Sequence, residues 1–122
     1  EWQKEKGGQW VKGKSGDTFG PIGPYLVTKD EIEDLFNLNL SLDLNGKRRQ
    51  TGNTGLMIFN FNFLISHLSS FITLMPGDII TTGTPPGVGL GMSPPQFLKD
   101  GDEMLLQVDN LGKQSLKVVK EK

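Results

Sequence analysis

The 122-residue sequence predicts a mostly β fold with one main helix, an α+β arrangement. Two observations favour it. Apolar residues alternate with polar ones on both sides of two turn signals, which is typical of hairpins, and a single stretch has helical periodicity. The 16 glycines and 7 prolines fall mostly between the apolar runs, where they mark tight turns. The sequence lacks a β–α–β rhythm, so a doubly wound parallel sheet is not expected.

The first predicted hairpin lies near the middle of the chain. Leucines alternate with polar residues and run directly into Asn45-Gly46, a dipeptide that tolerates the positive φ angles of a type I′ turn. Residues 47–51 should return as the second strand. We therefore expect one buried sheet face to be shared by Leu38, Leu40, Leu42 and Leu44.

A second hairpin is expected towards the C-terminus. Apolar residues alternate before and after a turn at residues 110–112. A turn at residues 76–78 should precede a further short strand at residues 79–82. The alternating residues of the second hairpin are Met104, Leu106, Val108, Leu116 and Val118.

One longer helix is expected over roughly residues 60–72. Its apolar residues recur at spacings of three and four, which places them on one face. Residues 28–31 have capping-box spacing and should open one or two helical turns, whereas the glycine- and proline-rich residues 1–24 should form an ordered loop. The helical stripe consists of Phe61, Leu64, Ile65, Leu68, Phe71 and Ile72.

Composition excludes several classes of protein. The net charge of −1 lacks the basic footprint of a nucleic-acid-binding domain, and no apolar run approaches the roughly 18 residues of a membrane span. The absence of cysteine excludes disulfides, thiolate zinc sites and a cysteine nucleophile, so a cytoplasmic location is expected. The first residue is not Met, and the polar N-terminus does not resemble a signal peptide.

Two glycine-rich segments could carry chemistry. Residues 13–19 place a lysine, two hydroxyls and a carboxylate close together, and residues 8–15 match the spacing of a phosphate-binding loop without the strand and helix that such a loop requires. Residues 81–89 place threonines beside a glycine-proline loop that could aim hydroxyls into a pocket. For both segments a purely structural turn remains the alternative. His67, the single histidine, fits a helix surface better than a general base.

Taken together and in order, these segments resemble the fumarylacetoacetate hydrolase family, over nearly the whole chain. Within it, the tail from Pro94 to Gly112 resembles the bacterial subgroup of 2,4-diketo-3-deoxy-sugar-acid hydrolases, ureidoglycolate lyases and 2-hydroxyhepta-2,4-diene-1,7-dioate isomerases. The matching stretches are residues 13–15, 17–24, 27–28, 45–46, Gln50, 53–54, 57–59, 76–78, 82–85 and 87–89.

The resemblance implies that residues 1–122 are the C-terminal part of a single catalytic domain, a portion of a mixed β-roll that is usually a homodimer. It implies a full-length enzyme that binds Mg²⁺ or Mn²⁺, with Ca²⁺ as a further option, and acts on a small 2-keto or 2,4-diketo acid. The family's acidic metal ligands and its His-Glu pair precede the segment matched here. Metal ligands are therefore assigned to none of these residues, and no tight metal binding is expected of this chain alone.

The resemblance also assigns roles to individual residues. Gln3 matches a glutamine that hydrogen-bonds substrate oxygens, Lys14 matches a lysine that stabilises negative charge, and Thr84 matches a threonine that faces the pocket. Asp17 and Thr18 match positions close to the metal and the substrate.

The implied activity is metal-dependent cleavage of a carbon–carbon bond, as in an acylpyruvase. The same residues would also suit an isomerase or decarboxylase of 2-oxo-dioates, or a ureidoglycolate lyase. The remaining alternative is a non-catalytic fragment that retains only the fold.

Overall fold

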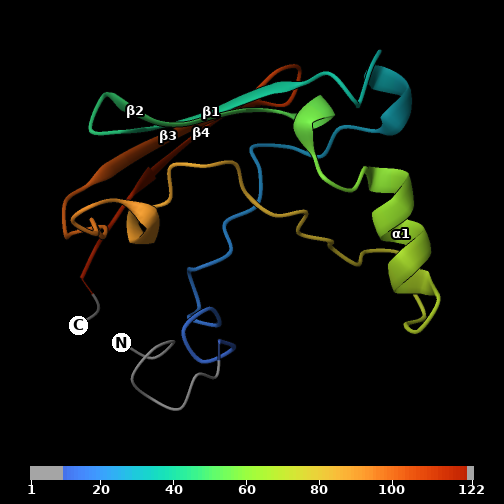
Figure 1. Ribbon diagram of the computed structural model, residues 1–122, viewed down its shortest axis with the longest axis horizontal. Helices are drawn as coiled ribbons and strands as arrows, with labels where there is room; N and C mark the ends of the chain where they lie inside the picture. The colour runs from blue at the N-terminus through green and yellow to red at the C-terminus, as the bar shows by residue number, and fades with distance from the viewer. Residues whose placement is uncertain (1–9, 121–122) are drawn as a thin grey trace.

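A computed structural model describes residues 10–120 and contains one four-stranded antiparallel sheet with strand order β2-β1-β3-β4. The strands are β1 (Asn39–Leu44), β2 (Lys47–Asn53), β3 (Glu103–Val108) and β4 (Gly112–Lys117). Both hairpins predicted from the sequence are confirmed. Figure 1 shows the sheet along one side of the molecule, with the connecting segments and the helix lying to the other side of it.

The turn of the first hairpin has the predicted geometry. Asn45 and Gly46 have φ angles of 50° and 73°, the left-handed region that a type I′ turn requires at both positions. Asn45 also ties this turn to the start of β3. Its backbone N–H donates to Glu103 O at 2.8 Å, and its Oδ1 accepts from Glu103 N at 2.9 Å. The two hairpins are thereby joined at one end of the sheet.

The pairing of β1 with β2 contains a β-bulge. Leu42 pairs with Gln50 and Asp43 with Arg48, which leaves Arg49 as an extra residue on β2. Because residues paired across a sheet direct their side chains to the same face, the bulge places Gln50 on the face of Leu42. An unbulged continuation from the turn would have opposed Leu42 with Arg49 instead.

The sheet has one apolar and one largely polar face. The apolar face carries Leu40, Leu42, Leu44, Met104, Leu106, Val108 and Leu116, which the strand register aligns in cross-strand pairs. The opposite face carries Asn39, Ser41, Asp43, Gln107 and Ser115 in the same register. The strict alternation of burial along β3 and β4 agrees with the sequence pattern.

The leucines of the first hairpin are less buried than expected. Leu38, just before β1, is only 4% exposed, but Leu40, Leu42 and Leu44 are half-buried, as are Ser41 and Asp43 between them. Two causes account for this. β1 is central in the sheet, so neighbouring strands screen both of its faces, and the described segments cover the apolar face only in part.

The helix α1 (Phe61–Ser69) confirms the predicted helix, although it ends three residues earlier than expected. Asn60 caps its N-terminus by accepting a hydrogen bond from Phe63 N at 2.9 Å. Within α1 only Phe61, Leu64 and Leu68 are half-buried, at the spacing that the apolar stripe predicted. No helix within residues 10–120 is long and apolar enough to cross a bilayer.

Three single turns of 3₁₀ helix complete the elements: η1 (Lys29–Glu31), η2 (Thr54–Leu56) and η3 (Gly89–Gly91). η1 confirms the helical turn expected at residues 28–31, but the reciprocal capping box does not form. The Thr28 hydroxyl instead donates to Glu31 Oε1 at 3.1 Å.

The strand expected at residues 79–82 is wrong. The preceding turn is present, with Asp78 N donating to Met75 O at 3.1 Å and Gly77 at φ 97°. The segment that follows pairs with no strand within residues 10–120. An extended apolar run becomes a strand only when a neighbouring strand satisfies its backbone groups, and local sequence does not reveal whether one is present.

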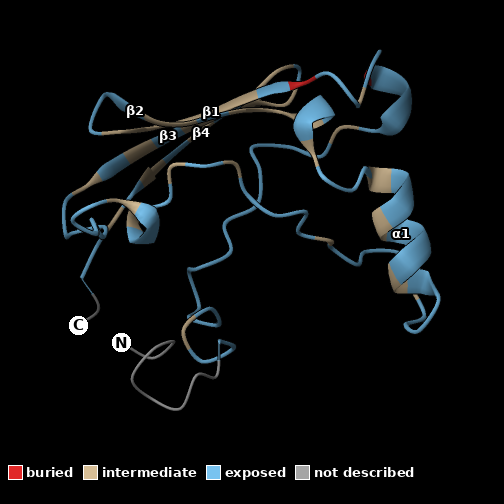
Figure 2. Cartoon of the chain, in the orientation of Figure 1, coloured by how far each residue is buried: buried red, intermediate tan, exposed pale blue. Residues whose placement is uncertain are grey.

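Few residues are buried. Ile32 and Leu38 are the buried hydrophobic residues of the described chain, at 7% and 4% exposure, while Leu26 and Ile58 are 94% and 92% exposed. Figure 2 shows that most of the described chain is exposed or only half-buried. Burying one such side chain contributes about 1.5–3 kcal/mol, whereas ordering each residue's backbone costs about 1–2 kcal/mol. The described residues therefore do not enclose a self-sufficient core.

Candidate functional site

Lys14 closes a tight turn at the start of the described chain. Gly13 N donates to Trp10 O at 3.1 Å, and Lys14 N donates to Val11 O at 3.0 Å. The exposed Lys14 ammonium lies 5.5 Å from the centroid of the Trp10 ring, within range of a cation–π interaction. No helix follows Ser15 before η1, so this segment is not a phosphate-binding loop.

Asp17 and Thr18 lie in the next turn, closed by Phe19 N donating to Gly16 O at 2.9 Å. Both side chains are exposed. Gln3, the third residue that the resemblance assigns to substrate contact, lies outside the described residues.

Thr84 lies in an extended segment that is held against β2. Gln50 Nε2 donates to Thr84 Oγ1 at 2.8 Å and to Pro85 O at 2.7 Å. These two bonds attach residues 81–92, here called the threonine loop, to the bulged part of β2. The neighbouring Arg49 extends the attachment, because its Nη1 lies 3.6 Å from Met92 Sδ.

Glycines allow this close contact. A Cβ on Gly87 would lie 2.0 Å from Arg49 O, and Gly87 has a φ of 112°, so only glycine fits there. A Cβ on Gly52 would lie 3.0 Å from Pro85 Cβ, which places Pro85 directly over β2. Since Gly52 pairs with Leu40, the threonine loop lies on the apolar face of the sheet.

The segment that follows residues 13–19, here called the lysine loop, reaches the same face of the sheet. A Cβ on Gly112 would lie 2.7 Å from the Tyr25 hydroxyl oxygen and 3.2 Å from Pro24 Cγ. Gly112 pairs with Val108, which in turn pairs with Leu40. The chain leading from Lys14 and the chain carrying Thr84 therefore both contact the apolar face. The Lys14 and Thr84 side chains contact different residues, so their convergence on one ligand remains a prediction.

His67 lies on the exposed surface of α1. Its ring is stacked 6.0 Å from Phe63 and meets the edge of Phe71 at 5.4 Å, between centroids. This is the helix-surface position that the sequence favoured.

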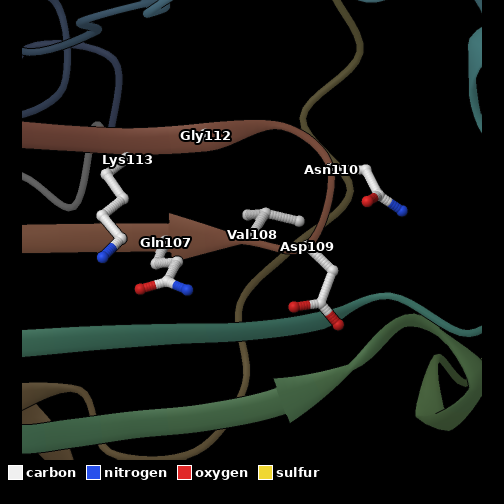
Figure 3. Close-up of a pocket in the computed structure, with 6 residues that line it drawn as sticks. All are labelled: Gln107, Val108, Asp109, Asn110, Gly112 and Lys113. Atoms are coloured by element: carbon white, nitrogen blue, oxygen red, sulfur yellow. The ribbon is translucent and has the colours of Figure 1, made fainter.

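A shallow pocket lies away from both loops. It has a volume of about 360 Å³ and opens at the β3–β4 turn (Figure 3). None of the predicted site residues lines it. Its lining consists of Gln107, Val108, Asp109, Asn110, Gly112 and Lys113.

The described residues do not fit a metal centre. Residues 10–120 contain no group of three or more histidine or acidic side chains that could hold an ion. Hard divalent cations are usually held by several oxygen ligands that include carboxylates. Asp17 alone does not meet that requirement.

Comparison with known proteins identifies the family. The family model described as fumarylacetoacetate (FAA) hydrolase C-terminal matches residues 1–119. The chain belongs to the fumarylacetoacetate hydrolase family. The match includes both glycine-rich loops, and the family expected from the sequence motifs is thereby confirmed.

Relatives within the fumarylacetoacetate hydrolase family agree in sequence and fold. A Burkholderia lata protein with a provisional hydrolase name is 59% identical over 115 residues, 93% of this chain and 41% of that protein. Fumarylacetoacetate hydrolase from Exiguobacterium antarcticum has a TM-score of 0.86 at 39% identity, covering 90% of this chain and 39% of its own.

A third relative was solved with ligands. Maleylpyruvate hydrolase from Sphingobium sp. SYK-6, in complex with manganese(II) and pyruvate, has a TM-score of 0.79 at 38% identity, covering 87% of this chain and 38% of its own. The chain thus spans about two fifths of the length of the relatives it matches. The α+β fold expected from the sequence is confirmed by these likenesses.

The sequence motifs assign no role to Arg49 or Gln50, although Gln50 belongs to one of the stretches that match the family. The Asn-Gly turn signalled the hairpin, but an added bulge residue has no comparable local signal. Arg49 Nε is buried without a hydrogen-bond partner within the described chain, which marks the bulge as a point where the packing is not fully satisfied.

Proposed function

We propose that the full-length protein is a metal-dependent hydrolase or lyase that cleaves a carbon–carbon bond in 2-keto or 2,4-diketo acids. We further propose that this chain supplies residues that contact the substrate. The observation that carries the proposal is the family match over residues 1–119, which includes the loops of Lys14 and Thr84. The related maleylpyruvate hydrolase, crystallised with pyruvate and manganese(II), supports a keto acid as ligand.

Lys14 is the residue best suited to charge stabilisation. Cleaving a 1,3-dicarbonyl compound leaves an enolate-like negative charge on the leaving fragment. A fixed ammonium group beside that charge stabilises the transition state more than the neutral ground state. Lys14 is held on a turn closed by backbone hydrogen bonds, and the proposal requires the rest of the protein to exclude water around it.

Gln3 and Thr84 are proposed to orient the substrate. Neither an amide nor an aliphatic hydroxyl is a strong base, so their contribution is to hold substrate oxygens in a productive position. Asp17 and Thr18, on the turn after Lys14, are proposed to lie close to the metal and the substrate.

The metal is proposed to be Mg²⁺ or Mn²⁺, supplying Lewis-acid polarisation of the substrate carbonyls when bound. Its acidic ligands are proposed to lie in the part of the full-length protein that precedes the segment matched here, as the family resemblance implies. Residues 10–120 themselves do not fit a metal centre.

The proposal extends to assembly and location. We expect a homodimer in the cytoplasm. Its partner is expected to be a small keto acid, and binding to nucleic acids or membranes is not expected. Sedimentation equilibrium of the full-length protein tests the dimer, and a monomer at micromolar concentration would contradict it.

The activity is tested with a substrate panel on the full-length protein, with Mg²⁺ or Mn²⁺ added. Acylpyruvates test the hydrolase, 2-oxo-dioates the isomerase and decarboxylase alternatives, and ureidoglycolate the lyase alternative. We expect metal-dependent release of pyruvate or a related 2-keto acid from an acylpyruvate. No turnover of any of these compounds with either metal would favour the non-catalytic alternative.

A further inference from the structure

The contact between β2 and the threonine loop suggests a role for Gln50, to which the sequence motifs assign none. Gln50 places both of its amide hydrogens on consecutive residues of the loop, at 2.8 Å from Thr84 Oγ1 and 2.7 Å from Pro85 O. A backbone carbonyl can only accept, so the bond to Pro85 fixes the orientation of the amide. The same nitrogen then donates to the threonine hydroxyl.

This orientation determines what the hydroxyl can do. Because Thr84 Oγ1 accepts from Gln50, its own proton is left to donate elsewhere. The acceptor within the loop, Pro85 O, lies at the long distance of 3.5 Å. Thr84 is also exposed, so its proton is available to a ligand oxygen. A hydroxyl held in this state suits a carboxylate or carbonyl oxygen, the groups that a keto acid presents.

The β-bulge makes this arrangement possible. By adding Arg49 to β2, it brings Gln50 opposite Leu42 and onto the face where the threonine loop lies. Bulges commonly redirect a side chain in this way beside functional sites. The loop approaches β2 so closely at Gly87 that a Cβ there would lie 2.0 Å from Arg49 O.

We propose that Gln50 is a positioning residue that holds the Thr84 hydroxyl as a hydrogen-bond donor towards an anionic substrate. Gln50 itself does not touch the substrate. This inference rests on the proposed function, because it takes the ligand of Thr84 to be a keto acid. It adds a residue, and a direction of hydrogen bonding, to that site.

The test uses Gln50→Glu in the full-length protein with Mn²⁺ and an acylpyruvate. Glutamate has the same shape but its carboxylate only accepts, so it repels Pro85 O and takes the Thr84 proton for itself. We expect KM to rise about tenfold or more, with kcat changed much less. Gln107→Glu makes the same substitution on the polar face of the sheet and should leave both constants unchanged.

Thr84→Val supplies the second half of a double-mutant cycle. If Gln50 acts through the threonine hydroxyl, Gln50→Glu should add little to KM once that hydroxyl is gone. Additive effects of the two substitutions, a Gln50→Glu variant that behaves like Gln107→Glu, or a loss confined to kcat would each overturn the proposal.

A measurement without turnover separates this inference from the proposed function. Hydrogen exchange of the loop amides in residues 83–92 should be faster in Gln50→Glu than in Gln107→Glu, because both anchoring bonds are lost. Unchanged exchange overturns the positioning role even if the enzyme is active. If the wild-type protein turns over no keto acid, the proposed function fails, and faster exchange would then support only the loop-holding contact.

Discussion

The side chains proposed to contact the substrate are a cation and two neutral hydrogen-bonding groups. Lys14, Gln3 and Thr84 can orient an anion and stabilise its charge, but none of them is a carboxylate or histidine that would move a proton at neutral pH. We therefore propose that the chain contributes substrate binding and charge stabilisation, and that residues outside it transfer protons.

Removing the ammonium group should slow the proposed reaction severely. In the full-length protein, Lys14→Ala should raise the barrier by about 3 kcal/mol, or lower kcat/KM about a hundredfold, because the developing enolate loses its counter-charge. Steady-state kinetics with an acylpyruvate measures this. Lys113→Ala, which removes a lysine from the strand β4, is the matched control. Equal effects of the two variants would exclude the role of Lys14.

Asp102 makes the stability of the hairpin junction depend on pH. Its carboxylate accepts from Asn45 Nδ2 at 2.9 Å and from Lys99 N at 2.8 Å, and these bonds hold the pKa of Asp102 below its usual value. The folded state therefore favours the ionised form. The resulting stabilisation is present above the unfolded pKa of about 3.9 and is lost as the pH falls through the lower folded pKa.

Asp102→Asn should consequently flatten the acid side of the stability profile. As the pH falls below about 4, the free energy of unfolding should fall less steeply in the variant than in the wild-type protein, since the variant has no carboxylate to protonate at this position. Urea titrations at a series of pH values measure the difference. Glu33→Gln, which neutralises an exposed carboxylate outside the junction, is the control, and parallel profiles for Asp102→Asn and the wild type would contradict the assignment.

Two glycines of the threonine loop differ in how closely they approach the neighbouring backbone. Gly83 and Gly87 both have positive φ angles, 98° and 112°, but they differ in surroundings. A Cβ on Gly83 meets nothing within 4 Å, whereas a Cβ on Gly87 would lie 2.0 Å from Arg49 O. Substitutions at these two glycines therefore distinguish the cost of backbone strain from the cost of a steric clash.

Alanine substitutions at these glycines should differ in cost. Gly83→Ala should destabilise the full-length protein by about 1–2 kcal/mol through strain alone. Gly87→Ala should cost more than about 3 kcal/mol, because it must also push the loop away from β2. Urea unfolding followed by circular dichroism measures both. Similar costs at the two positions would mean that the loop does not pack on β2 as described.

Some secondary-structure elements could be predicted from local sequence, and others could not. The Asn45-Gly46 turn and the alternation along β3 were predictable because both depend on neighbouring residues. The bulge at Arg49 was not predictable, because it depends on how β2 pairs with β1. The strand expected at residues 79–82 failed for the same reason, since an extended segment needs a partner that its own residues do not reveal.

The residues of the candidate site also differ in whether sequence could identify them. The family resemblance assigns roles to Lys14 and Thr84 from their motifs, and in the structure Lys14 lies in a turn and Thr84 in a loop. Gln50 acquired its role only from a contact across 34 positions of sequence. A lone glutamine in a strand gives no local indication that it anchors a distant loop.

At the scale of the whole molecule, the described chain exposes surface that a soluble fold would cover. Large apolar side chains are exposed on α1 and along the connecting segments, including Phe63 at 48% and Phe71 at 63%. In the described sheet, β2 and β4 are edge strands with unpaired backbone groups. Exposed apolar patches and open edges both favour association.

The isolated 122-residue chain should therefore self-associate. We expect sedimentation velocity at micromolar concentration to show species larger than the 13.4 kDa monomer, and the dye ANS to bind strongly. The full-length protein is the control and should bind little ANS. If the 122-residue chain were monomeric and bound little ANS, these residues would form a complete domain by themselves.

We propose that this chain supplies substrate contacts while the metal is held by the rest of the protein. A crystal structure of the full-length protein with Mn²⁺ and the pyruvate analogue oxalate tests it most directly. Lys14 Nζ and Thr84 Oγ1 should both contact the oxalate, and no pair of carboxylates from residues 10–120 should bind the ion. A separation of these two atoms well beyond about 12 Å, too far to reach one small ligand, or an ion held by two or more of this chain's carboxylates, would contradict it.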